Sequence, residues 1–374
     1  MNENKWNSLN ENEQKIYQLI KQDPFISQQM LAHELNLSRP SIANIISGLV
    51  KKGYILGKAY VLNEKQPVIC IGGANVDRKF YLKDKLQWHT SNPIRSTQNA
   101  GGVARNVAEN LGRLGLPSSL VTTSGTDSDW SFIKSESHPY VNTEDVIELS
   151  DETTGSYTAL IEDTGEMTVG FADMDVYDQL TPDEIRKKSA LLLHARCIIA
   201  DLNCPKDTLE TLSDFAENHH IPLILITVSA PKMERMPSNL KNITWLITNI
   251  DETEAFFKRK VSTKTEWKQA VDDYLNLDIT NVVITGGHQG AIIGSRDEGI
   301  HHIPSIKPHE IIDVTGAGDA FSSAVIYAWL EGESLINIGK AGVVNAVQTL
   351  TSPYTVRQNL SKVQLQKDME ETTI

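Results

Sequence analysis

Residues 313–321, with the sequence DVTGAGDAF, combine glycines and carboxylates in an order that could support group transfer. They precede an apolar stretch that we expect to be a helix, so the glycines would lie at a helix start. The backbone N–H groups of Gly316, Ala317 and Gly318 could then converge on an anion, and the helix dipole would add positive potential there. Asp319 comes next, where its carboxylate could accept a proton from a hydroxyl that attacks a bound phosphate. The alternative is that the glycines only form a tight turn and that Asp319 only caps the helix.

Four further motifs precede this segment. They are GGANVD at residues 72–77, GGVARN at 101–106, DETE at 251–254 and TGGHQG at 285–290. Together with DVTGAGDAF they closely resemble, in the same order, the motifs of the ribokinase-like (PfkB-type) carbohydrate kinases. The resemblance covers residues 67 to about 355.

The resemblance implies roles for the matching residues. Asp319 would be the catalytic base, and the anion hole for the transferred phosphoryl group would comprise Gly316, Ala317 and Gly318. The residues expected to hold sugar hydroxyls are Asn75, Asp77, Gly101, Gly102 and Asn106. The residues expected at the ATP site are Asp251, Glu254, Thr285, Gly287, Gly290 and Asn345.

The same resemblance implies that metal ions bind at the site. Glu254 would help to organise Mg²⁺ and phosphate, and Asp313 and Thr315 are candidates for the monovalent cation that family members often bind beside this motif. The implied mechanism is a direct in-line phosphoryl transfer from ATP. Two positions depart from the family pattern: Asp251 replaces the usual Asn of the N-x-x-E region, and Val103 stands where ribokinase carries a lysine.

Asp201 and Asn203 are two more candidates, because they follow an apolar segment that reads as a strand. Open α/β sheets place ligands at the carboxyl ends of their strands, so both side chains could contact the substrate. The equally open alternative is that they only cap the next helix.

Within the family, the chain most resembles the bacterial pseudouridine kinases. The shared strings are SNP at residues 91–93, GGVARN, TGEM at 164–167 with FADM at 171–174, and ADLN at 200–203. This resemblance implies ATP-dependent phosphorylation of the 5'-hydroxyl of pseudouridine. Thr227 replaces an Asp of these relatives, and SNPI replaces SNPG, so recognition of the base could differ.

The elements that would position these residues alternate between short β-branched strands and amphipathic helices from residue 67 onward. Four such alternations imply a parallel sheet with right-handed crossovers. We therefore expect a ribokinase-like three-layer α/β/α sandwich over residues 67–365, with a small β lid at about 78–98 and 155–173.

The N-terminal 62 residues have a different pattern. Three helical segments with serines at their expected N-caps, Ser27 and Ser38, end in a strand-like stretch around Gly57. We expect a winged helix-turn-helix domain at residues 1–62 and a short linker at 63–66. The candidate DNA-binding residues are Arg39, Ser41, Asn44, Lys51 and Lys52. The alternative is a structural appendage.

Charge supports this division. The formal net charge is -13, yet residues 1–65 hold eight basic and six acidic side chains, which leaves -15 on the rest. Only the N-terminal segment could therefore approach duplex DNA without strong repulsion.

Composition excludes several classes of protein. Three scattered cysteines indicate neither a disulfide framework nor a thiolate zinc site. We expect a cytoplasmic protein without a membrane partner, because no secretion signal and no run of about 18 apolar residues occurs. A homodimer is also expected.

Three hypotheses remain at this point. They are a pseudouridine kinase with a regulatory DNA-binding domain, another sugar or nucleoside kinase, and a transcription regulator that uses the kinase fold as a ligand sensor. Asp319 and the intact glycine turn argue against the third, because a sensor needs no base.

Overall fold

A computed structural model describes residues 9–56, 66–162 and 164–372. The chain divides into two compact units, residues 1–67 with 186–196, and residues 68–185 with 197–374. The domain boundaries expected at residues 62 and 67 stay predictions. Within the described residues, no helix is both long and apolar enough to cross a bilayer.

The N-terminal unit contains the three predicted helices, α2 (Glu11–Gln22), α3 (Gln28–Glu34) and α4 (Arg39–Lys51). Ser27 and Ser38 accept hydrogen bonds from the backbone N–H groups of Met30 and Ser41, which confirms both predicted N-caps. The apolar faces of the helices meet in one core of buried side chains. The expected wing and linker lie largely outside the described residues.

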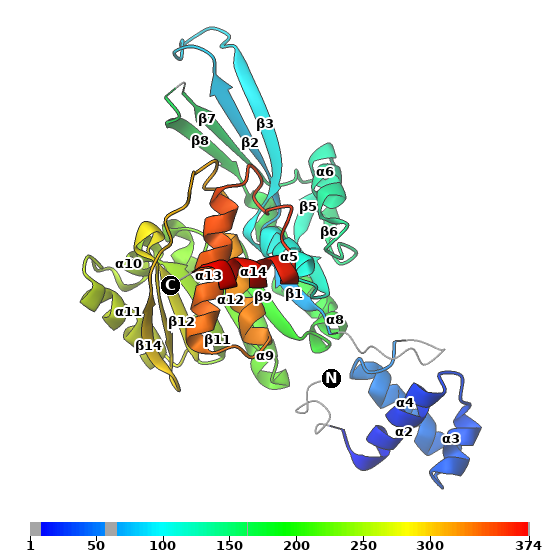
Figure 1. The fold of residues 1–374 in the computed structure, drawn as a ribbon. Helices are drawn as coiled ribbons and strands as arrows, with labels where there is room; N and C mark the ends of the chain where they lie inside the picture. The colour runs from blue at the N-terminus through cyan, green and yellow to red at the C-terminus, as the bar shows by residue number, and fades with distance from the viewer. Residues whose placement is uncertain (1–8, 57–65, 163, 373–374) are drawn as a thin grey trace. The chain divides into compact units, whose positions relative to one another are not determined.

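The second unit is built on an eight-stranded sheet (Figure 1). In spatial order its strands are β14 (Gly299–Ile303), β13 (Ala291–Ser295), β12 (Asn281–Thr285), β11 (Ile243–Asn249), β10 (Leu223–Ile226), β9 (Cys197–Asp201), β1 (Val68–Ile71) and β4 (Ser118–Val121). The six strands from β12 to β4 are parallel, as predicted, and β13 and β14 add an antiparallel edge. The central strands are short continuous apolar runs because both faces of the sheet are covered.

Helices cover both faces. Ile293 of β13 packs beside Gly339 of α13, whereas the next residue, Gly294, packs beside Val271 of α11. Successive strand residues point to opposite faces, so α13 and α11 lie on opposite sides of the sheet. This arrangement confirms the three-layer α/β/α fold.

The remaining helices and short strands have the following bounds. The α-helices are α5 (Val103–Arg113), α6 (Ser128–Ser137), α7 (Pro182–Lys187), α8 (Ser189–Leu193), α9 (Lys206–His219), α10 (Ile250–Phe257), α11 (Lys264–Asn276), α12 (Ala317–Leu330), α13 (Leu335–Leu350) and α14 (Lys362–Glu371). The short 3-10 helices are η1 (Asp175–Gln179), η2 (Ala230–Arg235) and η3 (Gly287–Gln289), and β5 (Thr123–Gly125) pairs with β6 (Ile147–Leu149).

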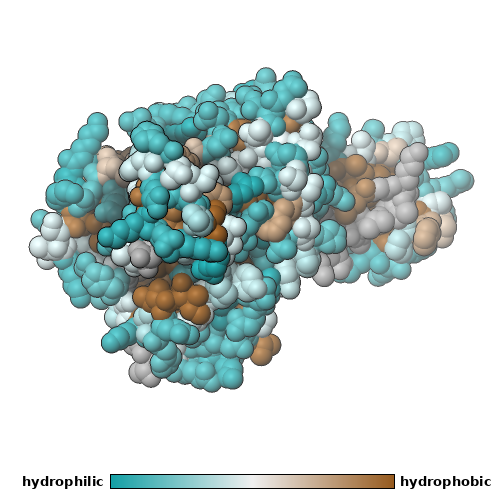
Figure 2. Space-filling view, turned by 90° about the horizontal axis from the view of Figure 1, so that it is seen from above, coloured by the Kyte–Doolittle hydropathy of each residue, from teal (hydrophilic) through white to brown (hydrophobic). Residues whose placement is uncertain are grey.

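A second sheet forms the β lid, in the order β3 (Ile94–Gly101), β2 (Asn75–Leu82), β7 (Ser156–Ile161) and β8 (Met167–Asp173). Its strands extend away from the main sheet (Figure 1). All seven residues of the edge strand β8 are exposed, including Met167 and Phe171. In the view from above, hydrophilic residues cover most of the visible surface and apolar ones form small separate areas (Figure 2). The apolar residues of β8 are therefore exposed on an edge strand, and such an edge can pair with another chain.

The close packing of α12 against α13 generates a stability prediction. A Cβ atom on Gly342 of α13 would lie 2.8 Å from Phe321 Cε2 and 2.9 Å from Val325 Cγ2, both on α12. We expect Gly342→Ala to lower the melting temperature of the second unit, because overpacking costs about 1–3 kcal/mol. That cost outweighs the gain of about 1 kcal/mol that alanine brings to a helix interior.

Gly48→Ala in α4 is the matched control. The nearest atom to its Cβ, Glu13 Oε1, would be 3.9 Å away, so only the helix-propensity gain remains and the N-terminal unit should become more stable. Thermal unfolding of the two variants by calorimetry checks the pair. A stabilising effect of Gly342→Ala would contradict the close approach of the two helices.

Candidate active site

The glycine turn before α12 has the geometry of an anion-binding site. Gly316 has a φ of 83°, a left-handed conformation that favours glycine, and a Cβ there would lie 2.1 Å from the Thr355 carbonyl oxygen. The Asp313 carboxylate accepts the backbone N–H of Thr315 at 2.9 Å and holds the turn. Because no atom lies within 4 Å of a Cβ placed on Gly318, the start of the helix is open to a ligand. The first N–H groups of this 14-residue helix can therefore face a phosphate.

Asp319 lies in the first turn of α12, opposite α5. Its Oδ2 accepts a hydrogen bond of 2.8 Å from the Nδ2 of Asn106, which brings two residues of different motifs together. The pKa of Asp319 is raised to about 7: removal from water raises it most, the bond from Asn106 lowers it, and the negative charges of Asp201 and Asp77 raise it. A carboxylate with a pKa near neutrality is suited to accept a proton from a hydroxyl.

Asp77 and Asn75 lie together at the start of β2. Asn75 Nδ2 donates to Asp77 Oδ1 at 2.6 Å, and a Cβ on Gly101 of the paired strand would lie 2.2 Å from Asp77 Oδ2. Burial raises the pKa of Asp77 to about 6, although Asn75 and Lys79 act in the opposite direction. These acceptor and donor groups are suited to neighbouring hydroxyls, as the sequence predicted for Asn75, Asp77 and Gly101.

Asp201 forms its hydrogen bonds within the protein. Its side chain is buried at the end of β9, and its carboxylate accepts the backbone N–H groups of Gly73 and Ala104 at 2.9 Å and of Asn203 at 2.8 Å. Burial raises its pKa, against the effect of these three bonds. Asp201 thus binds three backbone segments of the protein and positions them, and its contact with a substrate stays a prediction.

Gly102 and Asn203 complete this part of the site. Gly102 has a φ of 96°, and a Cβ there would lie 2.4 Å from the Gly73 carbonyl oxygen, so only glycine fits. Asn203 is also buried; its Oδ1 accepts a hydrogen bond from Lys232 Nζ and its carbonyl oxygen accepts one of 2.6 Å from Arg235. Sequence reasoning missed Lys232, because η2 carries no motif.

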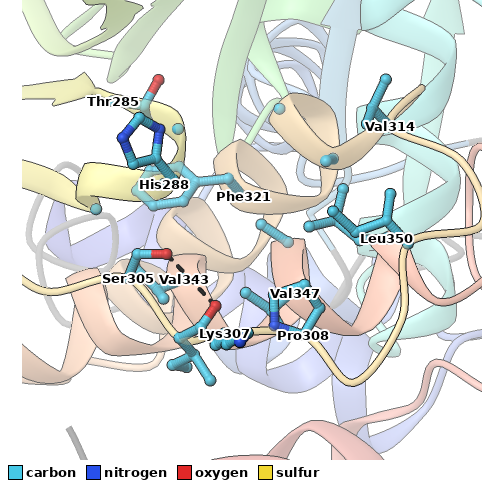
Figure 3. Close-up of a pocket in the computed structure, with 17 residues that line it drawn as sticks. Thr285, His288, Ser305, Lys307, Pro308, Val314, Phe321, Val343, Val347 and Leu350 are labelled. Atoms are coloured by element: carbon cyan, nitrogen blue, oxygen red, sulfur yellow. Dashed lines mark hydrogen bonds between the residues drawn. The ribbon is translucent and has the colours of Figure 1, made fainter.

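A cavity of about 610 Å³ adjoins the glycine turn (Figure 3). Its polar side chains include Thr285, His288 and Ser305, and apolar side chains such as Val314 and Phe321 form much of its wall. Gly287, Gly290, Ala317 and Gly318 also line it. The size and the mostly apolar lining suit a nucleoside, with its phosphates directed to the start of α12.

Asn345 does not line this cavity, in contrast to the expectation. It is fully buried between α12 and α13, where its Nδ2 donates to the Ala320 carbonyl oxygen at 2.8 Å and its Oδ1 accepts from Arg357 Nε at 3.0 Å. Its neighbours Val343 and Val347 line the cavity instead. Residues three or four apart share a helix face, and Asn345 lies on the opposite face of α13.

Asp251 and Glu254, two of the residues expected at the ATP site, lie on α10. Asp251 is exposed, and Glu254 bonds to Lys260 Nζ at 2.7 Å and to the Val261 N–H at 2.8 Å, so its carboxylate is occupied within the chain. The spacing N-x-x-E is met by Asn249 and Glu252, two residues earlier. Asn249 caps α10, and Glu252 returns to accept the Asn249 N–H at 3.0 Å. Both pairs therefore have this spacing, and the match of Asp251 and Glu254 to the family pattern stays a prediction.

Glu252 is the buried carboxylate of this pair. Its Oε2 accepts hydrogen bonds from the hydroxyls of Thr227 and Thr248. Burial raises its pKa, whereas these bonds lower it. In the part of the chain that the structure describes, no group of three or more His, Cys, Asp or Glu side chains could hold a metal ion by itself.

Asp313 and Thr315, the expected monovalent cation ligands, are bound to an ammonium group of the chain. Lys79 of β2 donates to the Asp313 carboxylate and, at 2.9 Å, to Thr315 Oγ1. Burial acts to raise the pKa of Asp313, but the bonds from Lys79 and Thr315 bring it below its usual value. These side-chain oxygens do not fit a K⁺ ion while Lys79 stays in place.

The candidate DNA-binding residues lie on or beside α4. Arg39, Asn44 and Lys51 are exposed. Ser41 shares a hydrogen bond of 2.8 Å with the capping Ser38, and Lys52 Nζ forms an ion pair of 2.7 Å with the buried Glu13. Ser41 and Lys52 therefore also have structural contacts within the unit that the sequence did not predict.

Family profiles match both units. The profile described as pfkB family carbohydrate kinase matches residues 65–362, and a winged helix-turn-helix DNA-binding profile matches residues 9–55.

Individual relatives agree with these profiles. The chain is 26% identical to the uncharacterized sugar kinase YeiI of Escherichia coli K12, over 90% of this chain and 93% of that one. It is 27% identical to the pseudouridine kinase of the same strain, over 80% and 95% of the two chains. The solved structure of Arabidopsis thaliana ribokinase complexed with ribose and ATP has a TM-score of 0.71 at 17% identity, covering 82% of this chain and all of that one, which supports the fold.

The raised pKa of Asp319 generates a prediction about stability. Between about pH 4 and 7 the native protein holds a proton that the unfolded chain has released, because an Asp carboxyl in water has a pKa of about 3.9. This group therefore lowers stability as the pH rises. We expect the difference in melting temperature, Asp319→Asn minus wild type, to grow as the pH rises from 4.5 to 8. The upper limit lies about one unit above the raised pKa, where the carboxyl is ionised in both states. Calorimetry over this range, with the exposed Asp272→Asn as control, measures the difference. A difference that does not change with pH would contradict the raised pKa.

The Lys79 contacts generate a second prediction. We expect wild-type protein to have the same melting temperature in K⁺ and in tetramethylammonium buffers, because the ammonium group already satisfies Asp313. In Lys79→Met the carboxylate loses this partner, and K⁺ should then stabilise the protein. The exposed lid variant Lys83→Met is the control. Stabilisation of the wild type by K⁺ would show that a cation site exists beside Lys79.

Proposed function

The chain belongs to the pfkB family of carbohydrate kinases and carries an N-terminal winged helix-turn-helix domain, and we propose that it phosphorylates the 5'-hydroxyl of pseudouridine with ATP. The observation that carries the proposal is the position of Asp319. Its carboxylate lies at the open start of α12, where the apolar cavity and the polar groups around Asn106 come together. A proton acceptor at this junction is what transfer between a nucleotide and a hydroxyl requires.

The chemistry follows from these positions. Asp319 accepts the proton of the 5'-hydroxyl as its oxygen forms a bond to the γ-phosphorus, while the bond from that phosphorus to the bridging oxygen breaks and ADP leaves. The N–H groups at the start of α12 face the charge that develops on the transferred group. Asn75 and Asp77 orient the ribose hydroxyls, so that the reacting oxygens are held in line.

Mg²⁺ fits this site as a partner of the nucleotide rather than of a protein cage. Mg²⁺ usually keeps several waters and binds through phosphates with one or two carboxylates, which agrees with the lack of a complete ligand cluster among the described residues. When bound it supplies charge neutralisation. Asn249 and Glu252 have the same spacing as Asp251 and Glu254, so either pair is proposed to act toward it.

The choice of pseudouridine as the substrate is more specific than the assignment of kinase activity, and it rests on resemblance. The pseudouridine kinase of Escherichia coli and the sequence strings shared with that subgroup support it. A second candidate is another sugar or nucleoside, which the similarity to the sugar kinase YeiI favours. We propose that Lys232 and Asn203 contribute to this choice, because the Lys232 ammonium reaches Asn203 just after the end of β9.

A kinase assay tests the substrate. We expect pseudouridine to give the highest kcat/KM in a panel with uridine, inosine, ribose and fructose, each with ATP and Mg²⁺. Asp319→Asn should lower kcat by about 10²-fold or more with little change in the KM for ATP, since it keeps the shape and loses the proton acceptor. Preference for another compound would replace pseudouridine. Unchanged kcat in Asp319→Asn would exclude Asp319 as the base, and absence of turnover on every compound would favour the ligand sensor.

We also propose that the N-terminal unit binds duplex DNA through α4. Arg39 and Asn44 are exposed and suited to base edges, and Lys51 at the helix end is suited to phosphate. The small positive charge of this segment predicts weak binding by a single unit. Specific binding would then need a homodimer, for which the exposed apolar strand β8 is the proposed contact.

A titration of the full chain with DNA from upstream of its own gene tests this proposal. We expect salt-dependent binding that is lost without residues 1–62 and weakened by Arg39→Ala, by about 1–3 kcal/mol if Arg39 contacts a base. Lys15→Ala is the control, because Lys15 pairs with Glu11 on α2. Equal binding by the full and truncated chains would identify the unit as a structural appendage.

A further inference from the structure

Arg105 is a buried cation of the GGVARN motif to which the sequence assigned no role. Its side chain is 3% exposed. Its Nε donates to Ser137 Oγ at 3.0 Å and its Nη1 to the Ala100 carbonyl oxygen at 3.2 Å, and its Nη2 forms an ion pair with Glu109. Arg105 thus joins α5 to α6 and to the end of β3.

One further bond of Arg105 leads toward Asp319. Nη1 also donates to Asn106 Oδ1 at 3.0 Å, and Asn106 Nδ2 donates to Asp319 Oδ2 at 2.8 Å. Guanidinium groups have donors and no acceptor, so the oxygen of the Asn106 amide must face Arg105. The amide nitrogen must then face Asp319. This orientation follows from the hydrogen-bond partners and does not depend on distinguishing the amide oxygen from nitrogen.

The orientation of the amide selects the protonation state of Asp319. An N–H donor favours the carboxylate form, whereas a reversed amide would present an oxygen that favours the protonated form. This donor offsets an electrostatic cost, because the negative charges of Asp77 on β2 and Asp201 on β9 both raise the pKa of Asp319. The charge of Arg105 from α5 acts in its favour.

We propose that Arg105 is a positioning residue that locks the Asn106 amide as a donor and so keeps Asp319 in its proton-accepting form. This inference rests on the proposed role of Asp319 as the base. Arg105 itself makes no contact with Asp319 among the described hydrogen bonds and ion pairs; apart from the long-range effect of its charge, it acts through Asn106.

A second buried arginine provides a matched control. Arg357 Nε donates to Asn345 Oδ1 at 3.0 Å, and its Nη1 pairs with Asp368 at 2.6 Å, with 3% of its side chain exposed. The amide of Asn345 donates to the Ala320 carbonyl oxygen, which does not titrate. Arg357→Met therefore removes an equally buried arginine–amide contact without altering a proton acceptor.

The test compares Arg105→Met, Arg105→Lys and Arg357→Met in the full chain. Glu109 keeps its ion pair of 2.7 Å with Arg113 in the Arg105 variants, which limits the loss of stability. The two readouts are the titration of the Asp319 carboxyl by NMR without ligands and the pH dependence of kcat. The NMR titration needs no turnover, so it distinguishes failure of this inference from failure of the proposed function.

We expect Arg105→Met to move the midpoint of the Asp319 titration upward by about one pH unit or more, and the rising limb of the kcat profile with it. Arg105→Lys should restore part of the shift, because an ammonium also has donors only. Arg357→Met should lose stability without a shift. An unshifted midpoint in folded Arg105→Met would overturn the proposal.

Asn106→Leu keeps the inference testable if Arg105→Met does not fold. Removing the donor should raise the Asp319 midpoint in the same direction. Arg105→Lys in that background keeps the positive charge and should add no further change, because the effect of the guanidinium donors passes through Asn106. A full additional shift in the double variant would show that Arg105 acts independently of Asn106, and would contradict the proposal.

Discussion

The buried carboxylate of Asp201 is the interaction on which the site depends. It accepts N–H groups from the loop after β1, from the start of α5 and from the segment after β9, so three separate motifs are held at one point. A Cβ on Gly72 would lie 2.3 Å from this carboxylate, which requires glycine there. The glycine-rich motifs thus serve two purposes: some expose backbone to a ligand, and others let backbone close around Asp201.

This arrangement concentrates negative charge. Asp77, Asp201 and Asp319 come from different elements, and each has a raised pKa because burial disfavours its ionised form. The three differ in their partners: Asp201 has three backbone donors, whereas the Asp319 carboxylate accepts from the side chain of Asn106. Asp201 has enough hydrogen-bond donors within the protein and is structural. Asp319 has fewer donors, so its carboxylate remains able to accept a proton. Keeping the Asp319 carboxylate ionised without enough donors costs stability. The same lack of donors raises its pKa and leaves it able to accept a proton, so its function and its pKa are linked.

Sequence reasoning succeeded where function or fold constrains a local pattern. Caps, apolar strands and the glycine turn at Gly316 all depend on neighbours in sequence, and the structure bears them out. It failed where a role depends on the direction of a side chain. Asn345 faces Arg357 rather than the cavity, and Lys79 reaches Asp313 from a strand 234 residues away. Two glutamates, Glu252 and Glu254, satisfy the N-x-x-E spacing loosely, and the sequence alone did not show that Asn249 and Glu252 form the capping box of α10.

The two units are proposed to bind different polyanions, a nucleotide and duplex DNA, through different physical interactions. The second unit carries the negative net charge of the chain, and its cavity has few charged side chains, so a nucleotide must be held by apolar contact and by the N–H groups of α12. Such binding depends weakly on salt, because buried interactions are little screened. Exposed side chains of α4 face water instead, where phosphate contacts release counterions and weaken steeply as salt rises. If both proposals hold, ionic strength should therefore separate the two activities, because salt that releases DNA would leave a nucleotide in the cavity.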